Sequence, residues 1–323
     1  MNDSVEHDRI LPRRWPGQEQ EGDKGACMSR KDDFTFFGYH VVCLIDVLGQ
    51  KQKLARWANL PDDGQITPEF IDALKQTAGT VLNFRDQFIQ LFEQLGRCTM
   101  PNKLAALPVE QQERYQRFKE CNVLVERFSD TFVFSSQIPN AHGDASITPM
   151  YRVLAACCHA MIVSLAAKVP VRGAITVGAG GVLGDGSFYG PALAEAHYLE
   201  KDVADSPRVV LSPTVREFLA DGQAYSPDPE IAQIMGQMAS TCRSFICQDV
   251  DGYWIVDFLG KGLRDMLGPD TGVTMAVKMA YDFVLAQAEQ FRHAGNTKLA
   301  LRYHLLQQYI EARLHLWGIQ TNG

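Results

Sequence analysis

The sequence has neither a long hydrophobic run nor an excess of positive charge. No segment approaches the ~20 consecutive apolar residues that a membrane-spanning helix needs. The 323 residues carry a formal net charge of −7, which argues against a protein that binds nucleic acids or acidic membranes through a broad basic surface. Local basic groups can still hold a small polyphosphate. With 46% hydrophobic and 21% charged residues, the composition is that of an ordinary soluble globular protein.

CxxC motifs and a secretion signal are also missing. None of the eight cysteines lies in a CxxC pair or at the spacing of zinc ligands, and several lie inside apolar runs. We therefore expect reduced thiols in the core, which suits a cytosolic protein. The N-terminal segment has no apolar stretch of the kind found in signal peptides. Together these absences predict a cytoplasmic location.

Several common catalytic motifs do not occur. The sequence has no Walker A loop, GxGxxG, GxSxG or HExxH motif, and its eight histidines show no ligand pairing. P-loop, dinucleotide-binding, serine hydrolase and zinc protease functions therefore lack their residues. The glycine-dense segment 178–190 (GAGGVLGDGSFYG) instead favours a tight turn in which the backbone approaches another group closely.

By composition the chain divides into a polar N-terminal tail (1–33), a main domain (34–260) and a C-terminal helical extension (261–323). The predicted strands are 36–46, a hairpin over 122–136, a strand with a glycine turn and return over 171–190, 207–213 and a pair within 244–259. The predicted helices are 68–96, 109–117, 150–170, 191–202, 271–293 and a last segment that ends near 316.

The predicted elements follow the order β-α-β-β-α-β. This order indicates an α+β fold with a ferredoxin-like core, in which helices pack on one face of an antiparallel sheet. The other face is then available for a ligand or a second subunit. A fold of this kind does not by itself specify a function.

Two aspartates, Asp46 and Asp130, end or interrupt otherwise apolar β-runs. If the first strand and the hairpin are neighbours in the sheet, these carboxylates meet at one end of it. Two buried like charges repel each other unless a cation lies between them, and Mg²⁺ or Mn²⁺ prefers oxygen ligands of this kind. The alternative is that each aspartate only caps a turn.

Two further features lie near the predicted carboxylate pair in sequence. The turn after Asp46, residues 47–51, contains Gly49 and can direct backbone amides at phosphates. It can equally be an ordinary hairpin or loop that only connects two elements. Arg172 opens an apolar strand, where it is either a surface residue or a clamp for phosphate.

In this order, LIDVLGQ (44–50), VERFSDTFVF (125–134), VRGAITVG (171–178) and YGPALAEAHYLE (189–200) resemble the catalytic domain of class III nucleotidyl cyclases. The resemblance covers about half of the chain and identifies 34–260 as the catalytic domain. It implies a homodimer whose two sites lie between the subunits.

The resemblance assigns a role to each matching residue. It implies two Mg²⁺ or Mn²⁺ ions held by the carboxylates of Asp46 and Asp130 and the carbonyl of Val47, with Arg172 binding phosphate. The resemblance also implies that the triphosphate binds to a turn made of Leu48, Gly49, Gln50 and Lys51.

The sequence departs from the purine cyclases at three positions. Ala194 and Tyr198 stand where those enzymes carry the Asn and Arg that stabilise the transition state, and Glu126 replaces the purine-reading Lys of adenylyl cyclases. The segments are most similar to the Pycsar pyrimidine cyclases of bacterial antiphage defence. That similarity implies conversion of UTP, or CTP in some members, to a cyclic monophosphate that signals to a separate effector protein. Glu126 and Arg127, together with Ser187, are candidates for reading the base edge.

Three alternatives stay open at this point. A purine cyclase uses the same metal site. A catalytically inactive cyclase-like module would bind a nucleotide or a protein partner without turnover, and the missing Asn and Arg favour it. A relative of polymerase palms or diguanylate cyclases is a third possibility, against which the absence of a GGDEF-type hairpin counts.

Overall fold

The computed structural model describes six stretches of the chain: 34–50, 66–97, 108–138, 145–220, 229–268 and 271–320. The predicted tail (1–33) and Lys51 of the predicted phosphate turn lie outside the described residues.

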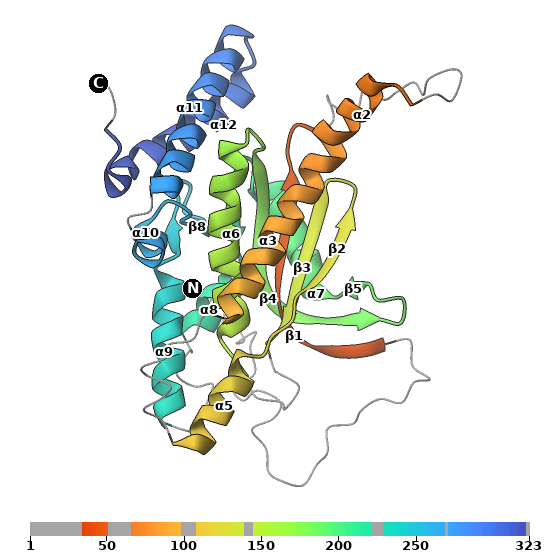
Figure 1. The fold of residues 1–323 in the computed structure, drawn as a ribbon, viewed down its shortest axis with the longest axis vertical. Coiled ribbons are helices and arrows are strands. Elements are labelled where there is room, and N and C mark those ends of the chain that lie inside the picture. The colour runs from red at the N-terminus through yellow and green to blue at the C-terminus, as the bar shows by residue number, and fades with distance from the viewer. Residues whose placement is uncertain are drawn as a thin grey trace, which may run out of the picture.

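The strands of the described ranges form one eight-stranded sheet with the order β2-β3-β1-β4-β6-β8-β7, and β5 pairs with β4 (Figure 1). The strands are β1 (Phe34–Val47), β2 (Leu124–Phe128), β3 (Thr131–Gln137), β4 (Val171–Leu183), β5 (Phe188–Tyr189), β6 (Val209–Leu211), β7 (Ile246–Gln248) and β8 (Trp254–Val256). All pairs are antiparallel except β4 with β6, which is parallel. The α+β class is therefore confirmed, whereas the prediction of a purely antiparallel sheet is wrong for the β4–β6 pair.

The helical segments follow the predicted positions closely in the first half of the chain and at the C-terminus. They are α2 (Pro68–Leu74), η2 (Lys75–Gly79), α3 (Thr80–Arg97), α5 (Val109–Lys119), α6 (Thr148–Ala166), α7 (Pro191–Tyr198), η3 (Leu199–Val203), α8 (Pro213–Ala220), α9 (Pro229–Arg243), α10 (Lys261–Leu267), α11 (Thr271–His293), α12 (Thr297–Glu311) and η4 (Leu314–Trp317). Helices α8, α9 and α10 were not predicted from the sequence.

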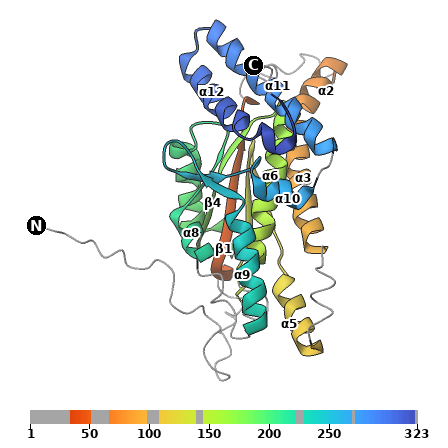
Figure 2. The ribbon, with the colours of Figure 1, turned by 90° about the vertical axis from the view of Figure 1, so that its left-hand side faces the viewer.

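The side chains of β1 alternate between two apolar layers. Val41, Cys43 and Ile45 join the main core, which also contains buried residues of α3 and α6. Val42 and Leu44 point the other way and pack in a second cluster with residues of α7. Figure 2 shows helices on both sides of the sheet. The prediction that helices cover only one face is therefore wrong, because α7 packs against the second face.

Helices α3 and α6 form the larger layer. In α3, Phe84, Phe88 and Phe92 recur every fourth residue and are buried, and the ring of Phe88 stacks on that of Phe134 in β3 with 3.9 Å between centroids. Helix α6 is the one described helix long and apolar enough to cross a membrane, yet 83% of its apolar window is buried inside the fold. Its apolar surface is therefore that of a core helix.

The C-terminal helices belong to the same core rather than standing apart from it. Val277 and Val284 of α11 and Trp317 of η4 are buried in the main cluster. In Figures 1 and 2, α11 and α12 rise beyond one end of the sheet next to α6.

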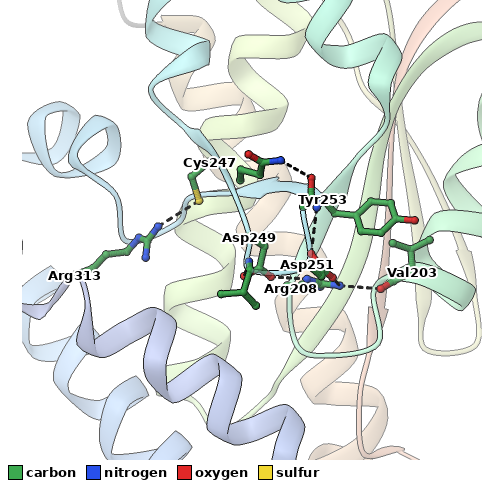
Figure 3. A network of polar contacts seen from close by, with 10 residues as sticks. Val203, Arg208, Cys247, Asp249, Asp251, Tyr253 and Arg313 are labelled. Carbon is green, nitrogen blue, oxygen red and sulfur yellow. Dashed lines mark hydrogen bonds and ion pairs between the residues drawn. The ribbon is translucent and has the colours of Figure 1, made fainter.

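A network of polar contacts links the C-terminal residues to the β7–β8 hairpin (Figure 3). Arg313 lies beside Cys247 of β7, with its Nη2 3.3 Å from Sγ, and its Nε is 2.5 Å from Asp257 Oδ1. On the far side of the hairpin, Arg208 forms ion pairs with Asp249 and Asp251. These contacts hold the far edge of the sheet between the β6 region and the end of α12.

Candidate functional site

The register of three neighbouring strands defines the candidate site. Asp46, near the end of β1, lies directly opposite Thr131 of β3 on one side and Arg172 of β4 on the other. It points away from the main core because it alternates with Val47, and so it shares the face of Leu44. A carboxylate, a hydroxyl and a guanidinium thus form one row across the sheet.

Asp46 is half-buried and uses both of its oxygens. Thr131 Oγ1 donates a hydrogen bond of 3.0 Å to Oδ1, and Arg172 Nε lies 3.4 Å from Oδ2. Burial raises the pKa of Asp46 above its ordinary value, as does the nearby charge of Asp130, while Thr131 and Arg172 act in the opposite direction. The carboxylate thus lies in a partly buried setting with one hydroxyl donor and one cation beside it.

Glu200, which was not predicted from the sequence, completes this group of charges. Its Oε1 lies 2.6 Å from Arg172 Nε, closer than Asp46 does. The side chain is buried, and burial raises its pKa. Glu200 falls within the segment that resembles the cyclases, but no local spacing connects a helical residue with a strand residue so far before it.

The hairpin turn that carries Asp130 abuts the end of β1. The amide of Val47 donates to the carbonyl of Asp130 at 3.1 Å, and that of Leu48 donates to Pro170 at 2.9 Å. Ser129 has a positive φ of 59°, which allows the tight turn. The amides of Val47 and Leu48 are thus used within the fold, which limits the predicted phosphate turn to the amides from Gly49 onward.

Gln50 lines a small pocket of about 110 Å³ behind the site. It is 2% exposed, and among the described residues its carboxamide has no hydrogen-bond partner. Thr77 of η2 and Arg127, Ser129 and Asp130 of the hairpin line the same pocket. The predicted turn therefore places an unpaired amide group beside Asp130.

The two predicted base readers Glu126 and Arg127 lie on opposite faces of β2. Glu126 shares the second face and accepts a hydrogen bond from the amide of Phe188 in β5. Arg127 lines the pocket of Gln50 on the α3 side. The two side chains therefore do not converge on one ligand edge. Ser187 donates to Asp185 Oδ1 at 2.6 Å, within its own turn.

The donor set suits a hard divalent cation only with additional ligands. Within the described ranges, no group of three or more His, Cys, Asp or Glu side chains is placed to hold a metal. Asp46 and Asp130 offer two carboxylates at one end of the sheet, so a divalent cation would need further oxygen ligands to complete its shell.

Comparison with known proteins returned no match: no protein-family model matches the chain, and no curated protein matches it.

Proposed function

We propose that the protein is a metal-dependent pyrimidine nucleotide cyclase that converts UTP to 3′,5′-cyclic UMP and pyrophosphate. The cyclic nucleotide would act as a second messenger on a separate effector protein in antiphage defence. Conversion of CTP to cyclic CMP is the nearest variant of this function, and a purine substrate is the next.

One observation supports the proposal above the others. Asp46, Arg172 and the Asp130 turn come from segments far apart in the sequence and meet at one end of the sheet, as the metal-binding and phosphate-binding residues of a cyclase must. The predicted β-α-β-β-α-β order also agrees with the succession of elements from β1 to β4.

In this mechanism the protein mainly positions the substrate. Thr131 orients the carboxylate of Asp46, Asp46 and Asp130 hold the cations, and Arg172 binds phosphate oxygens. When bound, Mg²⁺ or Mn²⁺ would supply charge stabilisation at the phosphates and would favour the ribose 3′-alkoxide. A bond forms between the 3′ oxygen and the α-phosphorus, the bond to the β-phosphate breaks, and the hydroxyl proton is released with pyrophosphate. A homodimer would supply the residues that one subunit does not bring together.

The test is to incubate the purified protein with each of the four nucleoside triphosphates and Mn²⁺. We expect cyclic UMP as the main product and none from Asp46→Ala or Asp130→Ala, which remove the carboxylates. Asp265→Ala is the matched control, because Asp265 is an exposed aspartate on α10 and its loss leaves the site intact. Full activity in either site variant would overturn the metal assignment.

A module that binds nucleotides without turnover is the second candidate. Ala194 and Tyr198 of α7 occupy the positions of the transition-state Asn and Arg, and Arg172 is already held by two carboxylates. Measurable binding of UTP with no product from any of the four nucleotides would select this function.

A further inference from the structure

The inner nitrogen of Arg172 lies between two carboxylates in an ion-pair contact, and its N–H bond is not aligned for a hydrogen bond with either of them. Nε lies 2.6 Å from Glu200 Oε1 and 3.4 Å from Asp46 Oδ2. No hydrogen bond or ion pair joins its two terminal nitrogens to another residue of the described ranges, and the side chain is 24% exposed. The outer edge of a guanidinium is the edge that binds a phosphate or carboxylate through two parallel hydrogen bonds. The two terminal nitrogens of Arg172 are therefore available to bind a ligand at the site.

Glu200 is built into the fold at this point. It lies in η3, a π-helical turn that continues α7, and the amide of Ala204 donates to the carbonyl of Leu199 at 2.8 Å. π-Turns within helices often occur at functional sites, because the added residue changes which side chains face the protein. Leu199 and Val203 are buried on either side of Glu200 and fix this turn against the sheet.

Glu200 and Asp46 compete for one cation. Both carboxylates approach Arg172 Nε, and the shorter distance is that to Glu200. Without Glu200, the guanidinium would be free to turn onto Asp46 and pair with it through two nitrogens. Such a pair would neutralise the carboxylate that the proposed function requires for a divalent cation.

From this geometry we infer that Glu200 is a positioning residue. It holds Arg172 by Nε so that the terminal nitrogens face an incoming phosphate group, and it keeps Asp46 available for a metal ion. The nucleotide role rests on the proposed function, whereas the hold on Arg172 is a property of the free protein.

The test begins with the free protein. In wild type, the Arg172 Nε–H should give a resolved ¹⁵N resonance that exchanges slowly with water, because Nε is shielded from solvent beside the buried carboxylate of Glu200. Glu200→Gln should shift this resonance and speed its exchange, and Glu200→Asp should restore it in part. Glu195→Gln is the matched control, since Glu195 is a half-buried glutamate of the adjoining α7 that forms no hydrogen bond or ion pair with Arg172. An unchanged resonance in Glu200→Gln would overturn the inference whatever the protein's activity.

Ligand binding gives the second readout. We expect Glu200→Gln to bind UTP with Mn²⁺, and pyrophosphate alone, about tenfold or more weakly than wild type, with KM affected more than kcat. Equal affinities in the two proteins would contradict the positioning role. If wild type binds pyrophosphate but neither binds nor converts UTP, the proposed function fails and the role of Glu200 stands. If wild type binds neither probe, both are wrong. Should Glu200→Gln fail to fold, the same comparisons are made with Glu200→Asp.

Discussion

At the scale of single residues, the site concentrates charge that water does not reach freely. Asp46 and Glu200 are carboxylates whose pKa values burial raises, and Arg172 lies between them. Groups of this kind are common at functional sites, where a buried charge is retained for binding rather than for stability. The uneven sharing of one arginine between two carboxylates is what distinguishes this group from an ordinary structural ion pair.

His40 of β1 provides a prediction about acid stability. Burial lowers the pKa of His40 from 6.5 to about 4. As the pH falls, the unfolded chain therefore binds a proton at His40 before the folded protein does. This contribution to stability is present above pH 6.5 and is lost as the pH falls toward 4. We expect His40→Leu to reduce the loss of unfolding free energy between pH 7 and pH 5 by about 2 kcal/mol.

Chemical denaturation at the two pH values measures this effect. His293→Leu is the matched control, because His293 is exposed at the end of α11 and should leave the pH dependence unchanged. An identical pH dependence in wild type and His40→Leu would show that His40 does not carry this loss.

At the scale of elements, glycines let β5 and α7 lie close against β4. A Cβ atom on Gly180 would clash with the ring of Phe188, and one on Gly190 would lie 2.6 Å from Gly180 Cα. The close approach that the glycine-rich segment predicted is therefore made by the chain itself. This packing brings α7, and with it Glu200, onto the face of Asp46.

We expect Gly190→Ala to destabilise the protein by about 3 kcal/mol or more, because Gly190 has a φ of 148° and no room for a methyl group. Gly186→Ala is the matched control. It also replaces a glycine of positive φ, 87°, but its Cβ would meet no atom within 4 Å, so a loss of only about 1 kcal/mol is expected. Urea unfolding compares the two variants, and equal losses would show that the close packing of α7 contributes little.

At the scale of the whole molecule, the C-terminal helices are tied to the sheet by a partly buried polar network as well as by the common core. The hydroxyl of Tyr309 donates to Asp257 Oδ1 at 2.8 Å and accepts from the amide of Leu259. The guanidinium of Arg313 pairs with the same carboxylate and lies over the Tyr309 ring, 3.9 Å from its centroid. Arg313, which follows α12, thus neutralises the charge of Asp257 directly after β8.

Arg313→Met should therefore cost about 3–5 kcal/mol, because it leaves Asp257, whose side chain is 14% exposed, buried without its cation. Arg302→Met is the matched control, because Arg302 lies on α12, which ends just before Arg313 in the chain. Its partner Asp205 is 62% exposed, so its loss should cost about 1 kcal/mol or less. Thermal and urea unfolding decide between these values, and a small effect of Arg313→Met would mean that water reaches Asp257.

The elements with a strong local pattern were predicted well. The strand over 36–46 is β1 (Phe34–Val47), and the helix over 271–293 is α11 (Thr271–His293). Helices α8, α9 and α10 were not predicted, and the parallel pairing of β4 with β6 was not foreseen. Periodicity reports which face of a segment is apolar, but it does not report which other segment covers that face.

The sequence by itself determined the α+β class, the positions of most strands and helices, and the carboxylates and arginine of the candidate site. These follow from local patterning, because a charge that ends an apolar run is visible within a few residues. Only the tertiary structure decided that Asp46 lies between Thr131 and Arg172, that α7 covers the second face, and that Glu200 holds Arg172. Each of these depends on strand register or helix docking between distant segments, and such pairings are selected by the packing of the whole core.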